Sequence, residues 1–209
     1  KAKGVVACSA GNHAQGVALG AQRSSIKSVI CLPAGAPISK VEATRALGAE
    51  ICLVPGVYDD AHKYALQLRD EHGYTFVHPF NDENVIAGQG TIGLEMLEQL
   101  PEVDNVIIPI GGGGLASGIA FAIKSLNPKI KVYGVQAEGA PSMFQSMQNG
   151  AIQTLPKVQT IADGIAVKSP GDLTFDICNH YLDGIVTVTE DEISAAILAL
   201  IEQQKLIAE

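Results

Sequence analysis

The sequence has little positive charge and no long apolar run. Its 209 residues carry 14 Lys and Arg against 22 Asp and Glu, which gives a formal net charge of −8. An acidic chain without a basic cluster does not attract phosphate backbones or anionic lipid, so we expect no nucleic-acid or membrane partner. No apolar stretch approaches the roughly 20 residues that span a bilayer. The segment Lys1–Lys3 does not resemble a secretory signal, and we expect a cytoplasmic protein.

Paired cysteines and metal-binding motifs are missing as well. The four cysteines, Cys8, Cys31, Cys52 and Cys178, lie far apart and form no C-x-x-C pair. Disulfide frameworks need denser cysteine and zinc sites need paired ligands, so we interpret the four as buried thiols of a reducing compartment. The sequence has no His-x-x-x-His, His-Glu-x-x-His or Gly-x-Ser-x-Gly pattern. These absences exclude a metal hydrolase of that kind and a serine esterase.

Short β-branched runs alternate with helix-length amphipathic segments, and 47% of the residues are hydrophobic. The predicted strands are Gly4–Cys8, Ser28–Leu32, Glu50–Val54, Thr75–His78, Asn105–Ile110, Lys131–Ala137 and Ile185–Thr189. They are apolar on both faces, which is typical of parallel strands covered on two sides. The predicted helices are Asn12–Arg23, Lys40–Leu47, Asp59–His72, Thr91–Leu100, Leu115–Leu126, Asp172–Tyr181 and Glu190–Gln204. This alternation predicts a parallel α/β architecture with right-handed crossovers.

Two of these helices begin with a predicted capping box. The boxes are Ser39–Glu42 and Thr189–Glu192, each with a hydroxyl at the N-cap and a carboxylate three residues later. After the second box one helix face carries Ile193, Ile197, Leu200 and Ile201. This apolar face predicts that the last helix packs against a sheet.

A domain boundary is predicted at Pro79–Asn84, where Pro, Asn and Asp interrupt the periodicity. Residues 1–81 would form a small α/β lobe, and residues 82–209 would be part of a larger one. The chain has no initiator Met and ends inside a predicted helix. We therefore expect an internal piece of a longer protein.

The strongest chemical signal is the segment Ile107–Leu115, in which a buried strand runs into four consecutive glycines and then into a helix. Residues without Cβ let several backbone N–H groups converge at a helix N-terminus, which indicates phosphate binding. A tight turn alone would need only one or two glycines. Gly111, Gly113 and Ala116 also fit a loose dinucleotide-binding pattern, with Glu138 as the candidate ribose ligand.

Two further turns are rich in small residues. In Ser9–Gly16, Ser9 and Asn12 could cap a helix whose first N–H groups would accept a carboxylate, and simple capping is the alternative. His13 by itself is more typical of a hydrogen-bonded packing residue than of a base. The segment Ala87–Thr91 precedes a predicted helix, where its glycines would either let a ligand approach or make the helix start flexible.

The segments Val5–Val17, Val85–Thr91, Pro109–Leu115 and Ile161–Gly164, in this order, resemble a known family. They are similar to the pyridoxal-phosphate-dependent threonine dehydratases (threonine ammonia-lyases) and the related serine racemases. The resemblance spans the whole chain, with the catabolic dehydratases slightly closer across Gly134–Glu138. It implies two parallel-sheet α/β lobes of the tryptophan-synthase-β-like fold, incomplete at both ends. It also implies a lyase, cofactor pyridoxal 5'-phosphate, and a homodimer or homotetramer in isoleucine biosynthesis or threonine catabolism.

The resemblance also implies roles for individual residues. The cofactor phosphate would be held by the amides of Gly111, Gly112, Gly113, Gly114 and Leu115. Asn12 would bind the phenolic oxygen of the pyridine ring, and the substrate carboxylate would be received by Ser9, Ala10, Gly11, Asn12 and His13. L-Threonine, with L-serine as a secondary substrate, would lose its β-hydroxyl to give a 2-oxo acid and ammonia. Glu209 matches a glutamate close to the cofactor and is a candidate catalytic residue.

The resemblance implies parts that this sequence does not contain. The family's Schiff-base lysine lies upstream of Lys1, so its identity is unknown here and we expect the chain by itself to be inactive. Serine racemases have a second serine where this chain has Ala10, which favours elimination over racemisation. Their acidic metal ligands are replaced by Gln136 and Ser142, so we expect no metal. An NAD-dependent dehydrogenase and a non-enzymatic anion-binding fragment remain as alternatives.

Overall fold

A computed structural model describes residues 3–208. These residues form two compact units, 3–79 and 80–208, which are described one after the other. The chain passes from the first unit to the second between Pro79 and Phe80.

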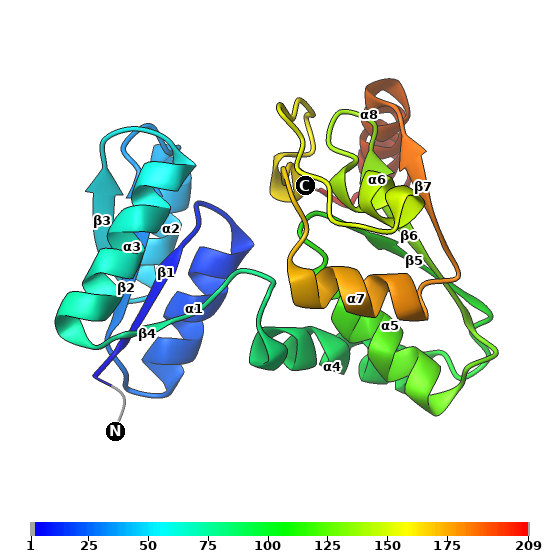
Figure 1. The fold of residues 1–209 in the computed structure, drawn as a ribbon, viewed down its shortest axis with the longest axis horizontal. Coiled ribbons are helices and arrows are strands. Elements are labelled where there is room, and N and C mark those ends of the chain that lie inside the picture. Colours follow the sequence, from blue (N-terminus) through cyan, green and yellow to red (C-terminus); the bar gives the residue numbers. More distant parts are fainter. Residues whose placement is uncertain (1–2, 209) are drawn as a thin grey trace. The chain divides into compact units, whose positions relative to one another are not determined.

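The first unit is a four-stranded parallel sheet with strand order β3-β2-β1-β4 (Figure 1). Its elements are β1 (Val5–Cys8), α1 (Asn12–Arg23), β2 (Ser28–Pro33), α2 (Ile38–Ala46), β3 (Glu50–Val54), α3 (Tyr58–His72) and β4 (Thr75–Phe76). One face of the sheet packs on α1 and α2 through a cluster that includes Ala14, Ala18 and Val41. The other packs on α3 through Ala61 and Ala65. Both faces are therefore covered, as the sequence predicts for parallel strands.

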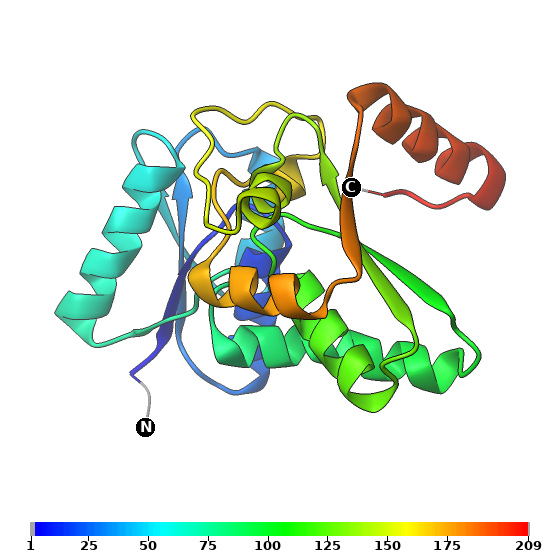
Figure 2. The same ribbon diagram turned by 45° about the vertical axis from the view of Figure 1, so that its right-hand side comes forward.

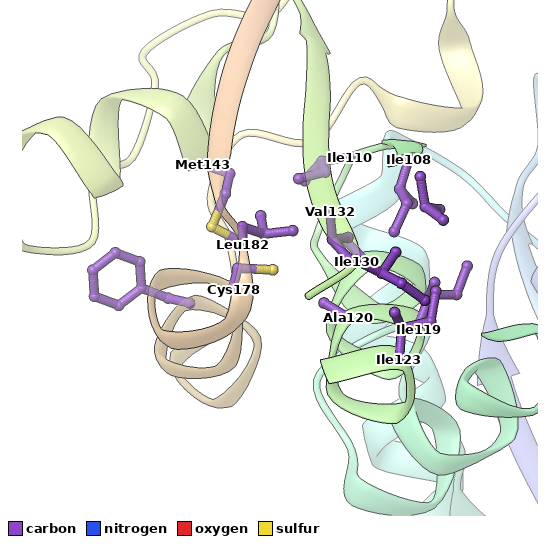
Figure 3. Close-up of a cluster of buried hydrophobic side chains, with 13 residues drawn as sticks. Ile108, Ile110, Ile119, Ala120, Ile123, Ile130, Val132, Met143, Cys178 and Leu182 are labelled. Carbon is purple, nitrogen blue, oxygen red and sulfur yellow. The ribbon is translucent and has the colours of Figure 1, made fainter. Parts of the chain in front are cut away.

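The second unit contains a three-stranded parallel sheet with order β5-β6-β7. Its elements are α4 (Glu83–Gln99), β5 (Asn105–Pro109), α5 (Gly114–Leu126), β6 (Lys131–Ala137), α6 (Ser142–Asn149), a 3-10 turn (Asp163–Ile165), α7 (Asp172–Tyr181), β7 (Gly184–Val188), α8 (Glu190–Ala199) and a π-helical turn η2 (Leu200–Gln204). Figure 3 shows the core of this unit, in which Ile108 and Val132 of the sheet pack with Ile119, Met143 and Cys178. Burial of this cluster fixes α5, α6 and α7 on one side of the sheet.

The other side of this second sheet is largely open among the described residues, contrary to the expectation of strands covered on two sides. The side chains of Ile107 and Val186 are 69% and 52% exposed. Helix α8 has no buried residue, so the prediction that its apolar face packs against a sheet is wrong for residues 190–208. Figure 2 shows α8, in red, on the far side of β7 from α5 and α7.

The structure corrects one of the two predicted capping boxes. The Thr189 box is confirmed, because the Thr189 hydroxyl accepts the Glu192 amide at 3.2 Å while the Glu192 carboxylate accepts the Thr189 amide at 2.8 Å. The Ser39 box is wrong, because α2 begins at Ile38 with Pro37 as its N-cap. Proline fixes φ near the helical value, so the helix starts ahead of the serine.

The glycine segment Ala87–Thr91 lies inside α4 rather than before it. This helix begins at Glu83, where the Asp82 carboxylate accepts the amides of the first turn. A Cβ on Gly118 of α5 would lie 2.5 Å from the backbone nitrogen of Gly90. Gly90 and Gly118 therefore let α4 and α5 pack backbone against backbone, and this glycine pair needs neither a ligand approach nor a flexible helix start to explain it. Helix α6 was not predicted at all.

Candidate functional site

The glycine turn between β5 and α5 has its carbonyl groups held by the protein around it. Gln136, whose side chain is fully buried, donates from Nε2 to the carbonyl of Ile110 at 3.1 Å. The buried hydroxyl of Thr174 donates to the carbonyl of Gly112 at 2.6 Å. The amide of Ser117 donates to the carbonyl of Gly113 at 2.8 Å. These three bonds fix the orientation of the turn's peptide planes.

The amides of the same turn are left available. Within residues 3–208, the backbone N–H groups from Gly111 to Ala116 have no hydrogen-bond acceptor. The first N–H groups of a helix lack intrahelical partners and carry the positive end of the helix dipole. A run of amides of this kind, with the carbonyls held by protein donors, has the chemistry that suits an anion such as a phosphate group.

Three of the four glycines of the turn are required by the packing around them. Gly113 has φ +99°, a left-handed conformation, and a Cβ there would lie 2.7 Å from Cε of Met143. A Cβ on Gly114 would lie 2.9 Å from Phe80, and a Cβ on Gly112 would overlap the Phe80 ring. The sequence alone indicates that a plain turn needs fewer than four glycines. Packing adds a separate reason for glycine at positions 112, 113 and 114.

In the first unit, the turn after β1 is ordered by short-range hydrogen bonds. The N-cap of α1 is Gly11, and no side chain caps this helix within the described residues. The hydroxyl of Ser9 instead accepts the Gly11 amide at 3.1 Å. The predicted capping of α1 by Ser9 and Asn12 is therefore wrong, while Asn12 is the first residue of the helix. Ala10 is half-buried and packs against the cluster under α1.

His13 is anchored rather than free to act as a base. Its Nε2 lies 3.0 Å from the carbonyl oxygen of Val77, to which it donates in the matching tautomer. Burial lowers the pKa of His13, partly offset by this hydrogen bond, so the ring is neutral at neutral pH. The prediction of a hydrogen-bonded packing residue is confirmed.

The remaining predicted residues take other positions. Glu138 is exposed at the end of β6, and Glu209 lies outside the described residues. Besides its bond to Ile110, Gln136 accepts the amide of Phe144 at 2.8 Å, and Ser142 donates to the carbonyl of Val167 at 2.9 Å. Both side chains thus serve the local backbone. No group of three or more His, Cys, Asp or Glu side chains among residues 3–208 is arranged to hold a metal ion.

Sequence reasoning missed the residues that support the glycine turn. Thr174 lies 62 positions from the carbonyl it holds, and Gln136 lies 26 positions from its partner. A threonine near the start of a helix carries no pattern that distinguishes it from a surface residue. Only the folded chain brings its hydroxyl to the turn.

The whole chain, residues 1–209, matches the family model described as pyridoxal-phosphate-dependent enzyme. The chain belongs to this family. It is 55% identical to the L-threonine ammonia-lyase of Thermotoga maritima over 99% of this chain and 52% of that protein. It is 49% identical to the catabolic L-threonine dehydratase of Escherichia coli K12 over 100% of this chain and 64% of that protein. The chain thus spans about half to two thirds of the length of these relatives.

Solved structures of the pyridoxal-phosphate enzymes share its fold. The processed form of threonine deaminase isoform 2 from Solanum lycopersicum superposes with a TM-score of 0.96 at 44% identity, covering 99% of this chain and 57% of that one. Maize serine racemase also gives a TM-score of 0.96, at 39% identity over 100% of this chain and 63% of that one. The predicted family, fold class and cofactor are confirmed, and the dehydrogenase alternative finds no support. No helix within residues 3–208 is both long and apolar enough to cross a membrane.

The residues present fit the family's cofactor at its phosphate group. A phosphate dianion requires several N–H donors and little competing negative charge. The turn Gly111–Leu115 offers five successive amides at the N-terminus of α5, and its carbonyls at Ile110, Gly112 and Gly113 point to protein donors instead.

Proposed function

We propose that the protein of which this chain forms part is a threonine dehydratase. It would convert L-threonine, and L-serine as a secondary substrate, to a 2-oxo acid and ammonia by β-elimination. The observation that carries the proposal is the run of open amides from Gly111 to Leu115, in a chain 55% identical to an L-threonine ammonia-lyase. Bound pyridoxal phosphate supplies an electron sink for the breaking Cα–H bond.

In this proposal the second unit, with residues 82–209 as its extent, holds the cofactor. The amides of Gly111, Gly112, Gly113, Gly114 and Leu115 bind the phosphate at the positive end of α5. Thr174 and Gln136 act as positioning residues, since each fixes a carbonyl of the turn from behind. Buried hydrogen-bonded contacts of this kind keep the amide directions fixed before the anion arrives.

The first unit, taken as residues 1–81, would be a mobile lobe that binds the substrate. Its turn Ser9, Ala10, Gly11, Asn12 and His13 stands at the N-terminus of α1, whose first N–H groups suit a carboxylate. Asn12 would bind the phenolic oxygen of the cofactor ring. His13 would stay neutral and act through its bond to the backbone, not as a proton carrier.

The catalytic base is proposed to be a lysine upstream of Lys1, with Glu209 close to the cofactor. Elimination is favoured over racemisation because Ala10 has no proton to exchange on the opposite face of the substrate. A serine racemase is the second candidate function, and the substitution Ala10→Ser tests whether Ala10 prevents racemisation. If Ala10 sets the outcome, the full-length A10S protein gains measurable D-serine formation from L-serine, while the parent forms none.

The activity test uses the full-length protein saturated with pyridoxal phosphate. We expect 2-oxobutanoate and ammonia in equal amounts from L-threonine, measured by coupled assay and by mass spectrometry. Asn12→Ala is the matched variant, and it should lose most of the activity while keeping the glycine turn intact. A folded, cofactor-loaded protein that releases no oxo acid from threonine or serine would reject the proposed function.

We further propose that the protein is a cytoplasmic homodimer or homotetramer of amino-acid metabolism, serving isoleucine biosynthesis or threonine catabolism. The acidic composition supports small molecules and further copies of the same protein as its binding partners. Sedimentation of the full-length protein tests the assembly, and a monomer at micromolar concentration would contradict it.

A further inference from the structure

Three of the four cysteines form a row across the first sheet. Cys8 of β1 is paired in register with Cys31 of β2, and Cys31 is paired with Cys52 of β3. Residues paired across parallel strands project to the same face of a sheet. All three belong to the cluster under α3. The row is invisible in the sequence, where the cysteines are separated by a helix in each case.

The row runs from the edge of the sheet to its interior. The strand order β3-β2-β1-β4 makes β3 an outer strand, so Cys52 lies at the edge. Cys52 is half-buried, whereas Cys31 and Cys8 are 0% exposed beneath α3. A reagent in solution therefore reaches the row at Cys52.

Reactivity along the row follows the same order. Burial raises the pKa of Cys31 to about 12, with further contributions from Cys52 and Cys8. Burial also raises the pKa of Cys8 to about 12. The thiolate is the nucleophile, so these two thiols are nearly inert toward an external disulfide at neutral pH.

The spacing of the row allows neighbouring cysteines to be joined. Adjacent strands lie about 4.8 Å apart, within the roughly 4.4–6.8 Å between Cα atoms that a disulfide tolerates. Parallel side chains keep their Cβ atoms at about the same spacing, longer than the preferred separation of about 3.8 Å. A bond between Cys31 and Cys52 would therefore be strained and easily reduced, as is typical of regulatory disulfides.

We propose that Cys52 is a thiol-modification site that reacts with low-molecular-weight disulfides and that Cys31 then resolves the adduct. The Cys52 thiolate attacks a disulfide RSSR, forming a Cys52–SR mixed disulfide and releasing RS⁻. The Cys31 thiol then loses its proton and attacks Sγ of Cys52, which expels the second RS⁻. In sum, two protein thiols are oxidised to one Cys31–Cys52 disulfide and RSSR is reduced to two RSH.

The sequence makes this order measurable, because trypsin places each cysteine in a separate peptide. The cleavage sites give peptides 4–23, 28–40, 46–63 and 169–205, which carry Cys8, Cys31, Cys52 and Cys178. The reduced full-length protein is incubated with oxidised glutathione, quenched with acid and iodoacetamide at intervals, and digested. We expect the glutathione adduct on 46–63 first, at least about tenfold faster than on 4–23 or 28–40, followed by a 28–40/46–63 cross-link.

Variants separate the two steps. Cys31→Ser should accumulate the adduct on 46–63 without a cross-link, and Cys52→Ser should leave both inner thiols unmodified. Cys8→Ala is the matched control and should keep both the adduct and the cross-link. The same reaction in urea should modify all four peptides at similar rates, since the fold no longer orders them. A first adduct on 4–23 or 28–40, or an adduct on 46–63 that never gives the cross-link in the folded parent, would overturn the proposal.

Discussion

The hydroxyl of Thr174 is predicted to hold the glycine turn in its anion-binding conformation. Replacing Thr174 by Val preserves the shape of the side chain but removes the donor to the Gly112 carbonyl at 2.6 Å and the acceptor of the Gly171 amide at 3.1 Å. Leaving a buried backbone group without its partner costs about 1–3 kcal/mol. Since Gly171 is only half-buried, we expect a total loss of about 2–4 kcal/mol in the free energy of unfolding.

Thr174→Ser is the control, because it keeps the hydroxyl and loses one buried methyl group, worth about 1 kcal/mol. Thermal unfolding of the full-length apo protein measures the stability of each variant, and fluorescence titration with pyridoxal phosphate measures affinity. We expect affinity to fall about tenfold in the valine variant, equivalent to about 1.4 kcal/mol, and to stay within about twofold in the serine variant. Equal losses in both variants would mean that methyl packing and not the hydroxyl supports the turn.

Other substitutions test the rest of the second unit. Gly118→Ala should lower the free energy of unfolding by about 3 kcal/mol or more, because the new Cβ meets the backbone of α4. Gly88→Ala is the control, since its Cβ would lie in open space, and it should raise the free energy of unfolding by about 0.5–1 kcal/mol. Equal effects of the two substitutions in thermal unfolding would contradict the close helix contact. Asp183→Asn should lower the free energy of unfolding by about 1–3 kcal/mol, because it removes the ion-pair partner of the mostly buried Lys124 ammonium group. Burial alone would raise the pKa of the Asp183 carboxyl group, but hydrogen bonds from lysines hold this pKa well below its usual range. The stability that the carboxylate contributes is therefore fully present above its unfolded-state pKa of about 3.9 and is lost as the pH falls from there toward the lower pKa of the folded state. The asparagine variant should lack this acid dependence in urea titrations from pH 5 to 2. Thr189→Ala should lower the free energy of unfolding by about 1 kcal/mol in urea titrations, because it removes the hydroxyl of the capping box; an unchanged value would contradict a stabilising role of this cap.

Several elements could be predicted residue by residue because their signals are local. The bounds of β3, β6, α1 and α7 agree with the periodicity of the sequence. The start of α4 was misplaced because glycines at 88 and 90 look like a helix break in one dimension. In three dimensions Gly90 opposes Gly118, and close packing outweighs its low helix propensity. Helix α6 was missed because its short, polar sequence has only a few apolar anchors, among them the buried Met143.

The sequence by itself determined the glycine turn, the family and the alternation of strands and helices, because each depends on neighbouring residues and on backbone freedom. Only the tertiary structure decided which distant groups complete these parts. It placed Thr174 and Gln136 behind the turn, left the amides of α5 open, and aligned Cys8, Cys31 and Cys52 in one row. Such contacts depend on strand order and register, which no single segment encodes because they follow from the packing of the whole sheet.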